Sequence, residues 1–384
     1  MKRSTERILT THCGSLPRPK DLLDLMEVKV HGGPYDPETY ARRVHSAVAE
    51  SVRKQVESGI DIPTDGEQGK LGFFAYVSER LTGFEPRPGT SLISFAEEVA
   101  AFPEYYKQYF SRAMFGGAIA PIVPLVCVGP VSYRGQESVC RDIDNLKAAL
   151  KGRKAEEVFM PAVAPSGVGR NEYYRTEEEY LYAVVEALHT EYRAIVDAGL
   201  IVQVDDPWLT EIYSDSSLSI AERRKRAEMY VEVLNHGLRG IPPEKVRFHT
   251  CYGINEGPRV HDAPLKDIVG LMLKVNAGAY SFEAANARHE HEYHVWENVK
   301  LPEGKVLIPG VVTHASNIVE HPELIAERLT RYAKLVGREN VIAGADCGFS
   351  SQATYNTEVH PTVVWAKFQA MAEGARLATE QLWR

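Results

Sequence analysis

Four side chains whose types suit a metal ion stand at the ends of short apolar segments. His249 and Cys251 in VRFHTCYG are two residues apart, so in an extended strand both point to the same side and can chelate one ion. Glu283 in AYSFEA and Cys347 in VIAGADCGF follow two later segments of the same kind. One imidazole, one carboxylate and two thiolates together suit tetrahedral Zn²⁺. These four residues are the predicted zinc ligands.

Cys127, Cys140 and the nearby histidines are predicted to take no part in this site. A single buried cysteine is more often a small apolar residue than a ligand, and Cys127 and Cys140 lie away from any predicted strand end. His289, His291 and His294 follow the predicted carboxylate ligand by a helical stretch and need not face the metal. The five cysteines are too sparse for the disulfide framework of a small secreted domain.

The elements that must position these ligands alternate along the chain. Eight short apolar segments are separated by polar loops and helical patterns, and several helical patterns end at a glycine. This alternation predicts an α/β fold with a parallel sheet, and eight units predict a (β/α)8 TIM barrel, whose strands all end on one face. The strands are expected at residues 8–11, 59–63, 158–163, 200–204, 245–249, 279–282, 305–312 and 340–344, and helices at residues 39–58, 177–198, 219–238, 264–275 and 322–336.

One region departs from the alternation. Residues 119–133 contain three prolines that would interrupt a central strand, which predicts a hairpin or an irregular segment. Residues 71–118 are rich in aromatic residues and also contain prolines. Residues 1–384 are therefore predicted to form a single barrel domain with an insertion of about residues 71–150 between the second and third strands. The insertion could act as a lid or as an oligomer contact.

The charge pattern argues against two classes of partner. The net charge is −8, and 44 Lys and Arg are scattered among 52 Asp and Glu, so no basic surface for nucleic acid is expected. The apolar runs are short, and the amino-terminal MKRSTERILTTHCGS has no apolar region of signal-peptide length. We therefore expect a cytoplasmic protein without a membrane segment, which could assemble as a homo-oligomer.

The motifs resemble, in their order along the chain, those of the catalytic domain of cobalamin-independent methionine synthases and their relatives, which include epoxyalkane:coenzyme M transferases. The matching motifs are TTHCGSLPRP at 10–19, DIPTDGEQ at 61–68, VQVDDPWL at 202–209, HTC, SFE and GADCGF. The resemblance implies a (β/α)8 barrel and a catalytic zinc ion held by His249, Cys251, Glu283 and Cys347. It also implies a single-barrel member, whereas the full-length synthases carry two barrels.

The same resemblance implies a binding pocket for an amino-acid thiol. The turn at Gly14 and Ser15 would contact the carboxylate of homocysteine, and Glu67 and Asp205 would hold its ammonium group. Two neighbouring carboxylates repel each other unless a cation lies between them, so their presence favours a thiol that carries an amine.

The chain departs from the family's pattern at two places. Cys13 stands before the Gly-Ser turn, where the family usually has Ile or a similar residue. In GVVTHASN, Thr313 stands where the family has a catalytic Asp, and His314 lies one place before the expected His. His314 and His12 are therefore the candidates for proton transfer.

These observations predict a zinc-dependent S-methyltransferase of methionine biosynthesis that methylates a small, homocysteine-like thiol, with a methyl-folate as the candidate donor. An alternative is an epoxide:coenzyme M type alkyltransferase, in which Arg18 and Lys70 would bind a sulfonate. A second alternative is a zinc-stabilised barrel that binds a metabolite without turnover. A decarboxylase of the uroporphyrinogen type would leave the predicted zinc ligands unexplained.

Overall fold

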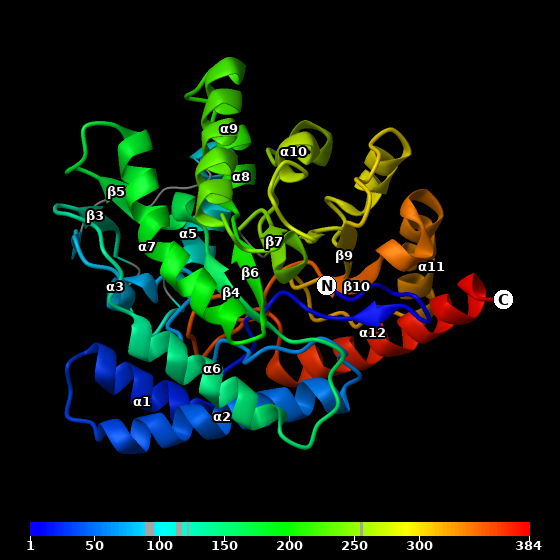
Figure 1. Cartoon of the computed structure of the whole chain (residues 1–384), viewed down its shortest axis with the longest axis horizontal. Helices are drawn as coiled ribbons and strands as arrows, with labels where there is room; N and C mark the ends of the chain where they lie inside the picture. The colour runs from blue at the N-terminus through cyan, green and yellow to red at the C-terminus, as the bar shows by residue number, and fades with distance from the viewer. Residues whose placement is uncertain (89–95, 113–116, 121–122, 254–255) are drawn as a thin grey trace.

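A curled parallel sheet of seven strands forms the centre of the protein (Figure 1). The structure, a computed structural model, describes residues 1–88, 96–112, 117–120, 123–253 and 256–384. Each strand pairs in parallel with its neighbour, in the order β1-β10-β9-β8-β7-β6-β4. The strands are β1 (Leu9–Thr10), β4 (Phe159–Val163), β6 (Ile201–Asp205), β7 (Val246–Thr250), β8 (Ala279–Phe282), β9 (Val306–Val312) and β10 (Ile342–Ala345). The α/β prediction is confirmed.

The predicted second strand, at residues 59–63, forms no regular strand. Its residues still lie between β1 and β4, because Thr11 and Ile62 form a parallel bridge and Pro63 O accepts a hydrogen bond from Phe159 N at 3.3 Å. Pro63 has no N–H to donate, which limits the ladder that this segment can form. The prediction of a full strand here was wrong in its extent, although the segment lies in the expected place.

Helices surround the sheet in Figure 1, and the five predicted ones are present. Local chemistry accounts for their ends: Asp36 accepts hydrogen bonds from the first turn of α2, and Ser219 and Glu222 form a capping box at α9. The helices are α1 (Lys20–Val30), α2 (Pro37–Glu57), α6 (Gln136–Leu150), α7 (Glu177–Asp197), α8 (Trp208–Glu211), α9 (Ile220–Gly237), α10 (Leu265–Met272), α11 (Pro322–Val336) and α12 (Pro361–Leu382).

Residues between the bridge at Ile62 and β4 form several short elements. A small sheet of three strands, in the order β2-β3-β5, includes the segment predicted as a hairpin. The elements are α3 (Val77–Arg80), β2 (Phe84–Pro86), α4 (Ala96–Ala101), α5 (Pro103–Arg112), β3 (Leu125–Cys127) and, after β4, β5 (Arg170–Asn171). α6 packs against α2 and α7 and so belongs to the surrounding helical layer. Residues 89–95, 113–116 and 121–122 of the predicted insertion lie outside the described residues, and its boundaries stay a prediction.

Side chains inside the curled sheet change from apolar to polar along the strands. Near the amino ends they form an apolar cluster of Leu9, Ile62, Phe159, Ile201, Ala279, Val306, Ile308 and Ile342. Further along, the alternate residues of β6 and β7 are polar or charged, as with Gln203 and Arg247, which are paired in register. The candidate metal ligands come last, at the carboxyl ends. The apolar cluster therefore fills the interior of the sheet on the amino-terminal side of these ligands.

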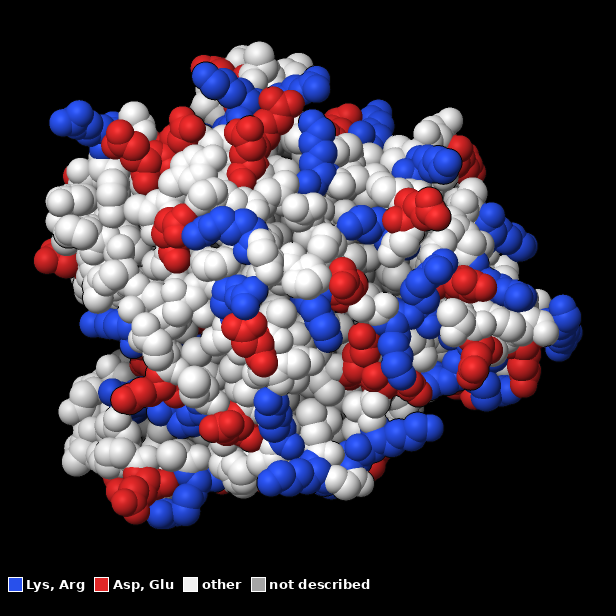
Figure 2. All heavy atoms as spheres, in the orientation of Figure 1, with Lys and Arg blue, Asp and Glu red and all other residues white. Residues whose placement is uncertain are grey.

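The surface matches the charge pattern of the sequence. Figure 2 shows Lys and Arg interspersed with Asp and Glu over this face of the molecule. Within the described part of the chain, none of the helices has the length and apolar character needed to cross a membrane.

Candidate metal centre

Two predicted ligands and one further cysteine meet at the carboxyl ends of β1, β7 and β10. The ligand atoms of Cys13, His249 and Cys347 all lie within 4.8 Å of one another. Cys251, two residues beyond His249 on the same face of the chain, is hydrogen-bonded to Cys347 through its thiol. Cys13, His249 and Cys251 are each no more than 5% exposed. The structure therefore brings together three of the four predicted ligands and adds one cysteine that sequence reasoning left out.

His249 is prepared to bind a cation. Its Nδ1 lies 3.2 Å from Ser281 Oγ, and its buried Nε2 has no hydrogen-bond partner among the described residues. Burial lowers the pKa of His249 to about 3, with further contributions from Arg247 and His314, so the imidazole is neutral. A neutral imidazole held through one nitrogen, with the other free beside two sulfurs, is the usual arrangement of a metal ligand.

The thiols of this group are protonated unless a cation lies among them. Burial raises the pKa of Cys13 to about 11. The pKa values of Cys251 and Cys347 are also raised, first by hydrogen bonds to a neighbouring thiol and then by burial and nearby negative charge. A soft or borderline divalent ion would convert these thiols to thiolates, so the donor set fits Zn²⁺.

Glu283, the fourth predicted ligand, has other partners. Its Oε1 accepts a hydrogen bond from Tyr252 N at 2.9 Å, and its Oε2 accepts from Asn286 Nδ2 at 2.7 Å and from Arg288 Nη2 at 3.1 Å. Its carboxylate groups with His314 and Asp346, with ligand atoms within 4.8 Å of one another. Glu283 still adds to the raised pKa of Cys251, so it lies near the sulfurs.

The residues predicted to bind an amino acid form a second, adjacent group. An added Cβ at Gly14 would lie 3.0 Å from Glu67 Oε1 and 2.8 Å from Pro161 Cγ, so this approach requires glycine. Burial first, and then the charge of Glu67, raise the pKa of Asp205 well above its usual value. The buried Glu67 Oε2 has no hydrogen-bond partner among the described residues.

Backbone contacts join this group to the sulfurs. Ser15 O accepts a hydrogen bond from Phe349 N at 2.9 Å, and an added Cβ at Gly348 would lie 2.0 Å from Ser15 Oγ. The turn after β1 therefore packs directly against the turn that carries Cys347. Glu67 itself has a positive φ of 55°, an uncommon backbone conformation that often occurs at functional sites.

The two histidines proposed for proton transfer differ in their partners. His12 is engaged at both nitrogens, because Nδ1 accepts from Gly14 N at 3.2 Å and Nε2 lies 2.8 Å from Gln55 Oε1. His314 is buried, and its Nδ1 has no partner within the described part of the chain. Burial lowers the pKa of His314 to about 4, so its imidazole is neutral and can accept a proton.

Three residues that sequence reasoning missed support the site. Asp346 accepts hydrogen bonds from the backbone N–H groups of Ala284, Ala285 and Asn286 and so fixes the loop after β8. Gln203 donates to Asp205 Oδ1 at 2.7 Å. The third, Arg247, lies two residues before His249 on the same face of β7. For Gln203 and Arg247 the available signal was their spacing from Asp205 and His249, since residues two apart on a strand share a face.

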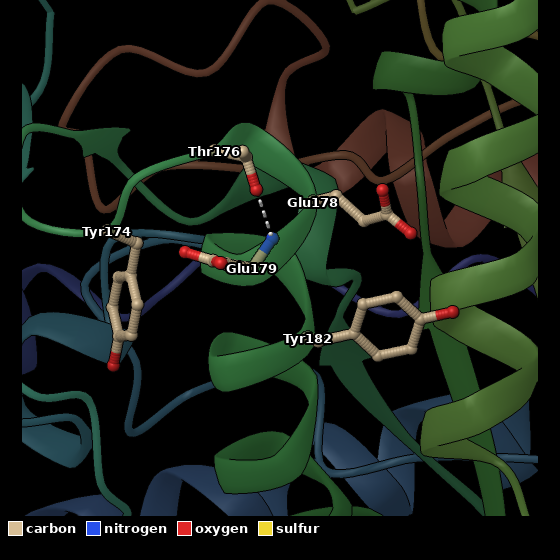
Figure 3. Close-up of a pocket in the computed structure, with 5 residues that line it drawn as sticks. All are labelled: Tyr174, Thr176, Glu178, Glu179 and Tyr182. Carbon is tan, nitrogen blue, oxygen red and sulfur yellow. Dashed lines mark hydrogen bonds between the residues drawn. The ribbon is translucent and has the colours of Figure 1, made fainter.

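The hollow in Figure 3 lies away from this chemistry. It is lined by Tyr174, Thr176, Glu178, Glu179 and Tyr182, at the start of α7, where Thr176 Oγ1 caps the helix by accepting a hydrogen bond from Glu179 N at 3.1 Å. It contains no cysteine or histidine, and the helix cap accounts for its polar contact. The buried Cys and His group is the stronger candidate for function.

The fold and this group together define a class: an α/β protein with a curled parallel sheet whose strand ends carry thiol and imidazole donors. The model of the family described as "Cobalamin-independent synthase, Catalytic domain" matches residues 162–367, and the chain belongs to this family. The predicted resemblance and enzyme class are thereby confirmed: the chain is a homologue of methionine synthases, which are methyltransferases. The match includes His249, Cys251, Glu283 and Cys347, whereas Cys13 lies outside it.

Relatives match over most of their length. A methionine synthase of Sulfolobus acidocaldarius is 26% identical over 342 residues, covering 88% of this chain and 85% of the relative. One of Saccharolobus solfataricus is 23% identical, covering 98% and 96%. The solved B12-independent methionine synthase of Shewanella sp. W3-18-1, in complex with selenomethionine, has a TM-score of 0.72 at 20% identity and covers 98% of this chain and 99% of that one. A putative vitamin-B12 independent methionine synthase of Listeria monocytogenes has a TM-score of 0.67 at 18% identity, covering 96% and 98%. These structures agree with the observed fold.

Proposed function

We propose that the chain is a zinc-dependent S-methyltransferase that methylates a small thiol carrying an amine, of the homocysteine type. One observation carries the proposal: a buried group of thiols and a neutral imidazole lies next to two buried carboxylates, one of which has an oxygen without a partner among the described residues. The first group suits a metal ion that would activate a sulfur. The second suits an ammonium group on the same small molecule.

The amine would be recognised by Glu67 and Asp205. Each carboxylate is buried, and each is destabilised in its charged form by burial. An ammonium group between them would supply the missing donor to Glu67 Oε2 and offset their mutual repulsion. Gly14 and Ser15, in the turn beside Glu67, would bind the substrate carboxylate.

The sulfur would be activated beside His249, Cys251 and Cys347, which would hold the ion. Zinc, when bound, lowers the pKa of a coordinated thiol so that the nucleophilic thiolate exists at neutral pH. In the overall reaction an S–CH₃ bond forms, the bond between the methyl group and its donor breaks, and the thiol proton passes to the leaving group. The neutral His314 would take up this proton and deliver it, as a general base and then a general acid.

The methyl donor, for which a methyl-folate is the candidate, would bind over the carboxyl ends of the strands. Segments of the predicted insertion cover this side: Ala353 N donates to Leu71 O at 2.8 Å, and His261 N donates to Glu98 Oε1 at 2.7 Å. We also propose that residues 61–63 complete the sheet as its eighth member, which makes the chain a single closed (β/α)8 barrel. The apolar cluster inside the sheet, to which Ile62 contributes, supports this closure.

The coenzyme M alternative has less support, because its predicted anion-binding residues are engaged. Arg18 donates to the backbone carbonyls of Glu67 and Lys70 through Nη2 at 2.9 and 2.7 Å. Lys70 Nζ donates to Pro161 O at 2.7 Å and lies 4.3 Å from the centre of the Tyr76 ring. Both cations therefore brace the carboxylate pocket.

A matched pair of ligands tests the proposal. Calorimetry on the zinc-loaded protein should detect binding of L-homocysteine but much weaker binding of 4-mercaptobutyrate, which differs only in lacking the amine. Selenium-edge X-ray absorption of bound L-selenohomocysteine should show a zinc neighbour. Preference for coenzyme M would favour the epoxide-type reaction instead. Absence of stoichiometric zinc, or a zinc shell that no thiol enters, would refute the proposed chemistry.

A further inference from the structure

Cys13 lies where a fourth protein donor to the metal would be expected. Its Sγ is within 4.8 Å of a ligand atom of both His249 and Cys347, and the residue is 5% exposed. The buried Nε2 of His249 has no hydrogen-bond partner among the described residues, whereas its Nδ1 is paired with Ser281. An unpartnered, buried imidazole nitrogen beside two thiols indicates a missing cation and not a simple apolar packing of cysteines.

The backbone at Cys13 is fixed by groups from inside the sheet. Gln203 Nε2 donates to Cys13 O, and Arg247 donates to His12 O and, at 2.9 Å, to Thr11 Oγ1. On the other side, the ring of His12 accepts a hydrogen bond from Gly14 N at 3.2 Å. These contacts hold the residues on both sides of Cys13, so its sulfur is positioned before any ligand binds, as effective metal sites require.

Glu283, by contrast, is satisfied without a metal. Both of its oxygens accept hydrogen bonds, and its Oε2 is paired with the Arg288 guanidinium at 3.1 Å. Arg288 is held in turn by Asp262 at 2.8 Å. Moving Glu283 toward a metal shared with His249 would weaken this ion pair, and weakening the pair of a buried carboxylate costs stability.

We propose that Cys13 is a third thiolate ligand in the resting protein, so that Cys13, His249, Cys251 and Cys347 hold the zinc ion until the substrate sulfur replaces Cys13, while Glu283 stays paired with Arg288 outside the ligand set. The inference rests on the proposed function for the presence of zinc, but it concerns the identity of the ligands. Three thiolates and one neutral imidazole form a soft, sulfur-rich set, which suits zinc and other thiophilic ions.

The first test counts sulfur atoms around zinc in the resting protein. Protein purified with a phosphine reductant, without any added thiol, should give a zinc X-ray absorption spectrum with three sulfur neighbours at about 2.3 Å and one nitrogen. Two sulfurs with two nitrogen or oxygen neighbours would overturn the inference. This measurement needs no variant, so it is decisive even if a substitution at Cys13 prevents folding.

The second test compares variants after cobalt replaces zinc. The thiolate-to-cobalt charge-transfer absorption per bound ion should fall by about one third in Cys13→Ser, since one thiolate of three is lost. It should be unchanged in Glu283→Gln and in Cys127→Ser, a buried cysteine outside the group. Unchanged absorption in Cys13→Ser, together with loss of the ion in Glu283→Gln, would establish the predicted ligand set with Glu283 instead.

These outcomes separate the two proposals. If the wild-type chain binds no stoichiometric zinc, the proposed function fails and the ligand question does not arise. If it binds zinc through two sulfurs and takes up selenohomocysteine, the methyltransferase proposal stands and only the role of Cys13 is refuted. Three sulfurs in the resting protein support the role of Cys13 whichever thiol is the substrate.

Discussion

Replacing Glu67 with glutamine should weaken binding of an amino thiol while stabilising the unliganded protein. Glu67 is 1% exposed, its Oε2 has no partner in the described part of the chain, and its charge contributes to the raised pKa of Asp205. A charge-assisted hydrogen bond contributes about 1.5–3 kcal/mol. Its loss in Glu67→Gln corresponds to a Kd for L-homocysteine about 10- to 200-fold higher.

The stability of the free protein should move in the opposite direction. Burial first, and then the charge of Asp65, raise the pKa of Glu67, against the opposing charges of Lys70 and Arg18. A carboxyl whose pKa is raised in the folded state costs stability as the pH rises above its unfolded-state pKa, and the cost is complete above the folded-state pKa. At neutral pH Glu67→Gln should therefore increase the free energy of unfolding, by about 0.5–2 kcal/mol as for other relieved functional sites.

Calorimetry and thermal unfolding on the same samples test both effects. The exposed Glu172→Gln should change neither quantity, and the affinity for 4-mercaptobutyrate should be nearly equal in wild type and Glu67→Gln. If Glu67→Gln binds L-homocysteine as tightly as the wild type, Glu67 does not hold the amine. If it also destabilises the unliganded protein, the carboxylate is structural and the assignment of this pocket is wrong.

Three further predictions concern groups around the site. His314→Gln should lower kcat by about 10²- to 10⁴-fold without changing the zinc content, and normal turnover would exclude proton transfer by this residue. Arg80→Ala should lower the apparent free energy of unfolding in urea by about 3–5 kcal/mol, because it removes the cation that lies 3.1 Å from the buried Glu191 carboxylate. Arg87→Ala, which removes one partner of an exposed ion pair, should cost at most about 1 kcal/mol. Burial lowers the pKa of His289, but two carboxylates outweigh this effect and raise the pKa from 6.5 to about 9. The stability that the protonated imidazole contributes is therefore complete below about pH 6.5 and disappears as the pH rises through 9. His289→Gln should flatten the decline in melting temperature over this interval.

Much of the fold followed from the sequence because regular patterns determine it. Apolar segments separated by helical patterns predicted the parallel sheet, and seven of the eight expected strands are present. Gly59, Gly199 and Gly337 have positive φ at helix ends, as expected, whereas Gly278 is required by its close approach to Pro243 O. The short elements before α6 were not predictable, since they depend on contacts with distant loops such as that at Leu71 and Ala353.

The candidate site was predictable residue by residue only where a motif pointed to it. His249, Cys251 and Cys347 were predicted as donors because residue type and strand-end position agreed. Cys13 was noted as a departure but not as a donor, because a single cysteine is more often an apolar residue than a ligand, even though the predicted barrel places the end of its first strand beside the end of its last. Glu283 was expected to bind metal, yet the distribution of its hydrogen bonds depends on Arg288, whose position is set by Asp262 in another loop.

Arg247 connects the group of metal donors with the pair of carboxylates. Its contacts with both groups explain why a charge is tolerated inside the sheet. Arg247 is 1% exposed, and burial lowers its pKa to about 10 against the opposing effects of Cys13 and Asp205. Its guanidinium lies 4.2 Å from the centre of the Phe159 ring, and its hydrogen bonds reach Thr11 and His12. A buried cation without anions nearby would destabilise the fold. The carboxylate of Asp205 offsets part of that cost, and Arg247 in turn fixes Thr11 and His12, the residues that precede Cys13.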